Sequence, residues 1–208
     1  MKKFGLFLLR NNIHLMTLIF VGWAAWAICH WDTLLLVQKL TLGLYAWLIV
    51  HEYEEGYKGR FFDLMLGRVM GIDYRTLTPG VVHIAQALYI TTVFSVALLF
   101  PHRLWLIFAV LILGLFEGFV HNMGIFLFRL KGVSPGWWTA MLMCAYSIWA
   151  IVVINRNITY DGIEWLWGVL MFIGCFLCME ILFQKLIGNT LANIKSSVKR
   201  FRKERFGK

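Results

Sequence analysis

The segment His51-Glu52-Tyr53-Glu54-Glu55 places an imidazole and three carboxylates directly after a long apolar run. Ionisable groups at membrane depth are costly, and they mark functional sites whose partners come from elsewhere in the chain. A second such pair, Glu117 and His121, lies inside another apolar run. Imidazole nitrogens and carboxylate oxygens together form a ligand set that suits zinc and other first-row metals. These residues therefore predict a metal site or an acid–base site.

The spacing of these residues places them on common helix faces. His51 and Glu55 are four residues apart, as are Glu117 and His121. Residues at this spacing lie on the same side of a helix, and facing helices of a bundle build dinuclear carboxylate sites from such groups. We predict that a divalent metal is bound by His51, Glu55, His83, Glu117 and His121. Zinc is favoured, and a di-iron or other dinuclear centre is the alternative.

Two further residues have predicted catalytic roles. Glu54 would transfer a proton to or from a water activated by the metal, and Asn122 would hydrogen-bond a ligand or a developing oxyanion. The letters from His51 to Glu55 also form HExxE, a zincin-like motif in which Glu replaces the second His. In that interpretation Glu52 is functional; otherwise it is a solvated residue.

The composition limits the class of protein. The chain has 208 residues, of which 60% are hydrophobic and 15% charged, and its mean hydropathy is +0.71. These values exclude an ordinary soluble domain and indicate a membrane protein with several spans. The net charge of +9 comes mostly from short segments beside the apolar runs and from the C-terminal tail. That distribution favours anionic lipid, and not nucleic acid, as the partner.

The apolar runs predict an all-α bundle of six transmembrane helices. A span needs roughly 17–25 apolar residues, and such runs occupy about 12–30, 34–51, 81–100, 104–128, 136–154 and 163–187. Residues 52–80 contain the apolar piece 61–66, which is too short to span, and we predict an interfacial or re-entrant element there. Residues 1–187 thus form a single transmembrane domain, and residues 188–208 form a basic cytoplasmic tail. Gly114 and Gly118 make a GxxxG pair that allows close helix approach.

The basic residues predict the orientation. Of the 20 Lys and Arg residues, all but Lys39, Arg103 and Arg156 lie in segments that share one side when six spans alternate. By the positive-inside rule both termini are cytoplasmic, in a bacterial inner membrane. The predicted site then lies near the cytoplasmic face. Glu180 lies at a similar depth and His14 on the same side, and whether they join the site stays open.

Three motifs in this order resemble the bacterial membrane proteins named for their HXXEE motif. His51 with Glu54-Glu55 fits that motif, and His121-Asn122 and Pro135-Gly136 through Thr139-Ala140 follow it, as they do in the family. The resemblance covers about residues 45–145. It implies that position 52 is free, that His51 and Glu55 are ligands, and that Glu54 is the base or a bridging carboxylate. The membrane hydrolases similar to CAAX prenyl proteases offer an analogy of architecture only.

These observations lead to one main hypothesis and two alternatives. The main one is a metal-dependent, hydrolase-like membrane enzyme that acts on a lipid or another amphipathic substrate. The first alternative is a non-enzymatic membrane protein that binds or moves a metal ion or protons, and the nearly apolar outer half counts against transport. The second is a structural polar cluster. The basic tail is expected to contact anionic lipid or to be a solvated topology signal, and the oligomeric state is open.

Overall fold

The computed structural model describes residues 2–56, 60–78 and 80–207, and every regular element in these ranges is a helix. In chain order they are α1 (Lys2–Arg10), α2 (Asn12–Cys29), α3 (Leu36–Gly56), α4 (Arg60–Met65), the π-helix η2 (Leu66–Met70), the 3-10 helix η3 (Tyr74–Thr76), α5 (Val81–Leu99), α6 (Leu104–Phe128), α7 (Trp137–Asn157), α8 (Ile163–Leu186) and α9 (Leu191–Phe206). Within these ranges, α2, α5, α6, α7 and α8 are long and apolar enough to cross a membrane. The prediction of an all-α protein with membrane-spanning helices is confirmed to this extent.

Helix α3 lies at the centre of the bundle. It contacts α2, α5, α6 and α7, and Leu44, Tyr45 and Leu48 on it are buried. The sequence predicted a span that ended at residue 51, whereas the helix continues to Gly56, so the segment from His51 to Glu55 forms its last turns. Because polar residues at both of its ends lower its hydropathy, α3 is not among the five apolar helices, and the count of six spans stays a prediction.

Small residues bring α6 close to α7. A Cβ atom added at Gly118 would lie 2.7 Å from the Cβ of Cys144, and one at Gly114 would overlap the Ser147 side chain. Both partners are on α7. The GxxxG pair therefore marks a close helix contact, and this contact holds the middle of α6 against α7 near Cys144 and Ser147.

Residues 52–80 end α3 and then form the short elements α4, η2 and η3. Helix α4 packs on α3, and η2 packs on α9. Phe62 and Leu66 are buried in a small cluster with Val81, Val82 and Phe183. The segment thus closes one end of the bundle, and its predicted interfacial position stays a prediction. Lys58, one of its predicted basic residues, lies outside the described residues.

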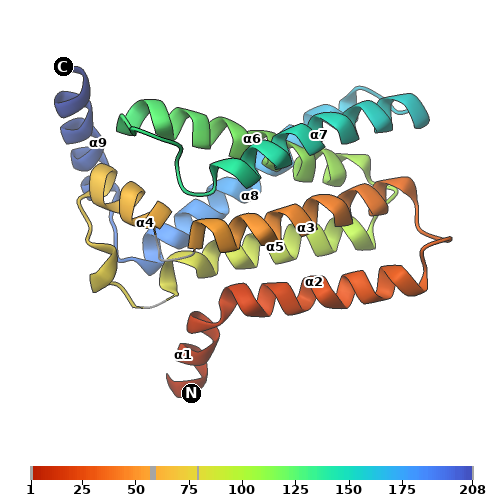
Figure 1. Cartoon of the computed structure of the whole chain (residues 1–208), viewed down its shortest axis with the longest axis horizontal. Coiled ribbons are helices and arrows are strands. Elements are labelled where there is room, and N and C mark those ends of the chain that lie inside the picture. Colours follow the sequence, from red (N-terminus) through yellow and green to blue (C-terminus); the bar gives the residue numbers. More distant parts are fainter. Residues whose placement is uncertain (1, 57–59, 79, 208) are drawn as a thin grey trace.

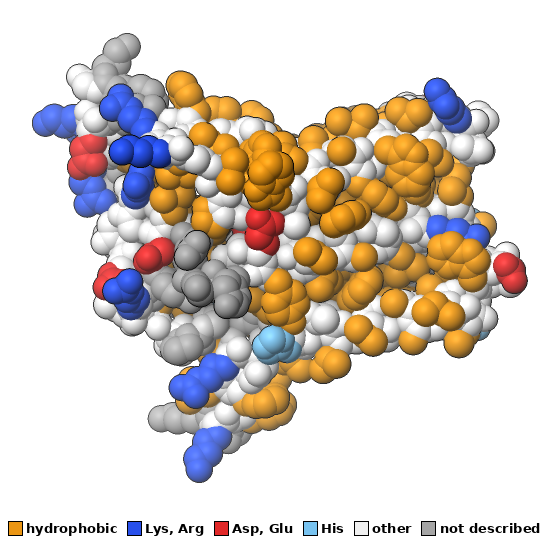
Figure 2. Space-filling model, in the orientation of Figure 1, with side chains coloured by type: hydrophobic (Ala, Val, Ile, Leu, Met, Phe, Trp, Pro, Cys, Tyr) orange, Lys and Arg blue, Asp and Glu red, His pale blue; other side chains and the backbone are white. Residues whose placement is uncertain are grey.

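Both termini lie at the same end of the helix bundle (Figure 1). An even number of crossings requires this arrangement. The C-terminal tail is helical: residues Leu191–Phe206 form helix α9, whose N-cap Thr190 accepts a hydrogen bond from the backbone N–H of Asn193 at 3.3 Å. In Figure 2, Lys and Arg side chains gather at the end that holds α1 and α9, and the middle of this face is largely hydrophobic. This is the surface pattern of a membrane protein.

Candidate metal centre

Two His/Glu pairs meet where the last turns of α3 face α6. His51 and Glu55 come from α3, and Glu117 and His121 come from α6. One ligand atom from each residue can be chosen so that all four lie within 4.8 Å of one another. Among the residues that the structure describes, these four are the group suited to hold a metal ion, and we call them the metal group. The sequence prediction of two i,i+4 pairs on facing helices is confirmed for these four residues.

The contacts converge on the Nε2 atoms of the two histidines. His121 Nε2 lies 2.6 Å from Glu55 Oε1 and 3.8 Å from Glu117 Oε2. His51 Nε2 lies 3.4 Å from Glu55 Oε1 and 3.6 Å from Glu117 Oε2. In a tetrahedral zinc site with metal–ligand bonds of about 2.0–2.2 Å, neighbouring ligand atoms are roughly 3.3 Å apart. Three of the four separations are close to this value, and the shortest must widen to admit an ion.

Thr139 fixes the orientation of the His51 ring. The Thr139 hydroxyl lies 2.9 Å from His51 Nδ1. The same hydroxyl donates its only proton to Glu54 Oε2 at 2.5 Å or to the Gly136 carbonyl at 3.2 Å. Its oxygen must therefore accept a hydrogen bond from Nδ1–H of His51. That assigns the proton to Nδ1 and directs the Nε2 lone pair at the two carboxylates, as in histidines that bind a metal.

Ser134 does the same for His121. Its Oγ lies 2.9 Å from His121 Nδ1 and donates a 3.4 Å hydrogen bond to the backbone carbonyl of His121. The hydroxyl therefore accepts from Nδ1–H, and Nε2 again carries the lone pair. Both hydroxyls belong to the segment between α6 and the first turn of α7. This one segment thus orients both imidazoles.

The facing atoms lack hydrogen-bond partners in the protein. His51 and His121 have no exposed surface, and Glu55 is 2% exposed. His51 Nε2, His121 Nε2 and Glu55 Oε1 are buried, and none has a partner with hydrogen-bond geometry. An imidazole nitrogen and a carboxylate oxygen at these distances repel one another unless a proton or a metal ion lies between them. A buried polar atom without a partner is costly, so the arrangement fits a bound divalent cation, which would balance the charges of Glu55 and Glu117.

The backbone of Gly136 packs against the side chains of this group and forms the floor of the site, that is, its closed side. It precedes α7 with φ 81°, in the left-handed region. A Cβ atom there would lie 2.5 Å from Glu55 Cγ, 2.9 Å from His121 Cε1 and 3.0 Å from His51 Cε1. Only glycine allows the backbone to adopt this conformation while it touches three ligand residues.

The structure does not bring His83 into the four-residue group. The His83 ring lies against Phe62, with centroids 4.6 Å apart, and next to Gly56. Its Nδ1 is buried without a hydrogen-bond partner. Helix α5 therefore places His83 against α4 and the last residue of α3, and not among the four residues that could share an ion. The expected five-residue ligand set is therefore reduced to four here.

The two residues with predicted catalytic roles do not lie inside the group. Glu54 Oε2 accepts hydrogen bonds from the hydroxyl and the backbone N–H of Thr139, so it acts on His51 through Thr139. Asn122 donates to the Gly118 carbonyl at 2.8 Å and accepts from Trp137 Nε1 at 3.1 Å. It is exposed and engaged with its own helix and α7. In this structure both residues have positioning contacts.

The residues left open by the sequence are also placed. Glu52 is 1% exposed and accepts a 2.6 Å hydrogen bond from Gln86 on α5. It is therefore not solvated. His14 pairs with the Tyr53 hydroxyl at 2.8 Å on an exposed face and is separate from the metal group. Glu180 accepts a 2.5 Å hydrogen bond from Gln184 on its own helix, α8.

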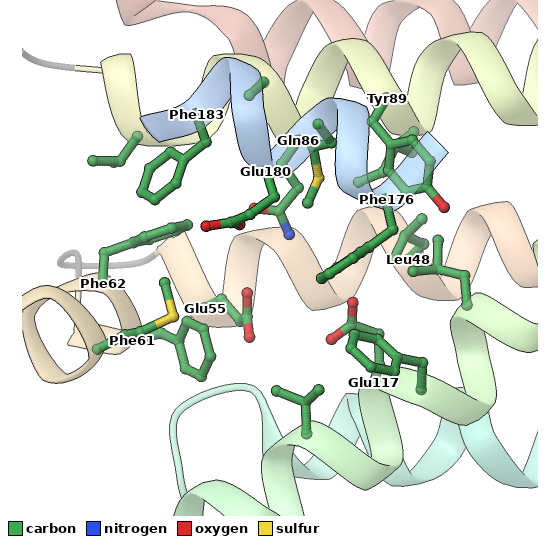
Figure 3. A pocket seen from close by; sticks show the side chains of 18 residues that line it. Leu48, Glu55, Phe61, Phe62, Gln86, Tyr89, Glu117, Phe176, Glu180 and Phe183 are labelled. Carbon is green, nitrogen blue, oxygen red and sulfur yellow. The ribbon is translucent and has the colours of Figure 1, made fainter. Parts of the chain in front are cut away.

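A largely apolar cavity of about 150 Å³ adjoins the group (Figure 3). Aromatic and aliphatic side chains from α3, α4, α5, α6 and α8 form most of its wall. Glu55 and Glu117 reach it from the metal group, and Glu180 points into it from α8. Glu117, with 14% of its side chain exposed, is the most accessible of the four ligand residues. The group is therefore closed on the side of Gly136 and faces the cavity through its carboxylates.

Thr139, Ser134 and Gly136 contact the candidate ligand residues, and the search of the sequence for ligands did not assign them. Hydroxyl groups and glycines are common, and no i,i+4 pattern distinguishes them. All three belong to the segment Ser134-Pro135-Gly136 through Thr139. In the sequence, this segment was noted only for its resemblance to the HXXEE-motif proteins. Its position at a turn before an apolar helix is a second signal, because irregular backbone at such a depth lines a site.

Removing the Thr139 hydroxyl should weaken metal binding. Thr139→Val keeps the shape of the side chain but removes the partner of His51 Nδ1, so the ring and its tautomer are no longer held. Loss of such an outer partner typically lowers metal affinity about 10–100-fold. Zinc competition against a chromophoric chelator measures the change, and Thr139→Ser, which keeps the hydroxyl, is the control. Equal affinity for the Val variant and the parent would contradict the assigned role.

No known protein family, curated protein or solved structure matches this chain in comparisons of sequence and fold. The resemblance to the HXXEE-motif proteins therefore stays a prediction from the residues. The case for function rests on the geometry described above.

Proposed function

We propose that this protein is a metal-dependent integral membrane enzyme of the hydrolase type. It would hold a divalent ion, with zinc favoured, through His51, Glu55, Glu117 and His121. The observation that carries the proposal is the convergence of two oriented Nε2 atoms and two carboxylates in a buried place where three facing atoms lack hydrogen-bond partners. Two nitrogens and two carboxylate oxygens are a ligand set that zinc accepts, and iron or manganese would use the same residues.

When bound there, a divalent ion would supply Lewis-acid polarisation of a carbonyl or phosphoryl oxygen and activation of a water molecule. The protein residues divide into two groups around it. His51, His121 and Glu55 form the buried side, with Nε2–Oε1 distances of 2.6 and 3.4 Å. Glu117 is farther from both imidazoles and faces the cavity. A catalytic metal site keeps one coordination position for substrate. Substrate would reach that position from the cavity, on the side of Glu117.

The cavity supports a lipid or another amphipathic molecule as substrate. Its apolar wall includes Phe61, Phe62, Met65, Phe176 and Phe183. Such a wall holds an acyl chain and keeps bulk water away, while the carboxylate side receives the polar group to be cleaved. Since the metal group lies at the bundle end that carries the basic tail, the cavity would serve the cytoplasmic leaflet under the predicted orientation.

Glu180 is the residue best placed to transfer a proton in this cavity. It is a cavity-lining carboxylate outside the four-residue ligand group, and Gln184 holds one of its oxygens. From the sequence we predicted that Glu54 transfers the proton, but its carboxylate accepts hydrogen bonds from Thr139. We assign proton transfer to Glu180 and the orientation of His51 to Glu54.

The test is lipid turnover by purified protein in liposomes made from a bacterial polar lipid extract, followed by mass spectrometry of the lipids. Zinc-loaded protein should cleave at least one lipid class, and a chelator should stop it. Glu180→Gln should keep its zinc but lose activity about 10²–10⁴-fold, the usual contribution of a general acid or base. Asp63→Asn, which removes an exposed carboxylate from α4, is the charge-matched control and should change nothing.

The other functions predict different results. A protein that only binds or moves metal would hold zinc and show no turnover in any variant. A structural cluster would hold no zinc and would lose folding when its histidines are replaced. Turnover that is unchanged in Glu180→Gln would leave the enzyme but remove Glu180 from the mechanism.

A further inference from the structure

Three arginines from separate parts of the chain meet at the end of the bundle that carries α9, and none of the four residues of the metal group lines the hollow between them. They line a hollow of about 540 Å³ between η2, the end of α6 and α9. Its lining consists of Gly67, Arg68, Gly71, Leu127, Phe128, Arg129, Arg200, Phe201 and Glu204. We call this hollow the arginine pocket. Because Arg68, Arg129 and Arg200 are distant in sequence, the fold itself builds the concentration of charge.

Two of the three arginine side chains have contacts that place them at the pocket, and the third follows from the backbone conformation at the end of α6. Arg68 Nη1 donates a 2.5 Å hydrogen bond to the Phe128 carbonyl, which leaves its other N–H groups for a ligand. Arg200 lies against the backbone of Gly71, where an added Cβ would be 2.6 Å from Nη2. Arg129 ends α6 in the left-handed region with φ 48°, which is uncommon for a residue other than glycine. These contacts hold the guanidinium groups of Arg68 and Arg200 at the rim of the pocket.

The pocket has an excess of positive charge. Glu204 is the single carboxylate among its lining residues, and it lies 4.0 Å from Arg200 with 65% of its side chain exposed. It can leave the pocket without losing a buried contact. Three guanidinium groups against one exposed carboxylate favour an oxyanion, and the planar fork of arginine matches the oxygens of a phosphate.

The walls of the pocket indicate where the phosphate comes from. Leu127, Phe128 and Phe201 line it beside the arginines, and the rings of Phe128 and Phe201 are 6.1 Å apart. Helix α6, which ends here, is one of the apolar helices able to cross a membrane. A free phosphate would gain nothing from contact with apolar side chains. A lipid would, because glycerol and acyl chains lie next to its headgroup. We infer that the arginine pocket binds the phosphate of an anionic membrane lipid, independently of the metal centre.

Native mass spectrometry in detergent with added phosphatidylglycerol tests this inference. The parent protein should retain the lipid, and it should retain phosphatidylcholine much less because the choline opposes the arginines. Arg68→Gln, Arg129→Gln, Arg200→Gln should lower the affinity roughly a hundredfold. The control is Lys195→Gln, Lys199→Gln, Arg202→Gln, which removes the same charge from a different surface of α9. It should retain phosphatidylglycerol as the parent does.

A second variant distinguishes a loss of lipid binding from a failure to fold. Gly67 lines the pocket, and a Cβ atom there would meet nothing within 4 Å. Gly67→Glu should therefore fold, place a carboxylate among the arginines, and abolish retention of the lipid while thermal stability without lipid is kept. Equal losses in the two triple variants would overturn the pocket in favour of diffuse attraction to the tail. Displacement of the lipid by millimolar inorganic phosphate at equal affinity would overturn the assignment to a lipid.

Discussion

The purified protein should hold a divalent metal ion, and the double variant His51→Ala, His121→Ala should hold none. The variant removes both oriented Nε2 atoms and leaves only Glu55 and Glu117, whose oxygens cannot replace the nitrogen ligands. Metal analysis by mass spectrometry of the detergent-purified protein, as isolated and after loading with zinc, gives the stoichiometry and the identity of the ion. Zinc would support hydrolytic chemistry, and iron would support redox chemistry at the same residues.

The matched control is His30→Ala, His102→Ala, which removes two exposed histidines from elsewhere in the chain. It should keep the full metal content. Metal should also raise the thermal stability of the parent and of this control, because an ion that binds only the folded state at 100 times its Kd adds about 2.7 kcal/mol. The His51, His121 variant should show no such shift. A folded parent that stays free of metal after loading would refute the metal centre.

Gly136→Ala should strongly weaken metal binding although it replaces none of the four candidate ligand residues. Its Cβ would lie 2.5–3.0 Å from carbon atoms of Glu55, His121 and His51, so at least one of these side chains must move. Displacements near 1 Å at a catalytic site cost about a hundredfold in activity. We expect a loss of zinc affinity of about that size or more, measured by the same chelator competition as for Thr139→Val, together with loss of turnover.

Gly188→Ala separates the collision from backbone strain. Gly188 has φ 71°, and a Cβ atom there would meet nothing within 4 Å. Both substitutions force alanine into the left-handed region, which costs roughly 1–2 kcal/mol, but only Gly136→Ala strikes the metal ligands. The control should be slightly less stable and bind zinc normally. If the two variants bind zinc equally well, Gly136 is not the floor of the site.

The helical class of the protein and the location of its apolar segments were predictable from the sequence because both are local properties. Runs of apolar residues fix the approximate bounds of α2, α5, α6, α7 and α8, since only long helices satisfy every backbone group in lipid. The four ligand residues were predictable for a similar reason. An ionisable residue in apolar sequence is conspicuous, and a spacing of four residues fixes His51 with Glu55, and Glu117 with His121, on common helix faces.

The direction in which each candidate points was decided by the tertiary structure. Successive residues of a helix are turned by about 100°, so Glu54 faces Thr139 while Glu55 faces the metal group. In the same way Asn122 faces Trp137 while His121 faces the metal group. The sequence placed each pair side by side and could not tell which neighbour faced the site.

The orienting contacts were also beyond the sequence, because they join segments that are far apart in the chain. His51 and Thr139 are separated by 88 positions, and no local sequence pattern at either residue predicts a contact with the other. The same holds for the contacts of Gly136 and for the arginine pocket, because each is built from residues that are distant in the chain and close only in the folded structure. The sequence by itself determined which groups are costly to bury in a membrane protein. Only the packing of the helices determined which of these groups offset that cost for one another, because this depends on distances between atoms that the order of residues does not contain.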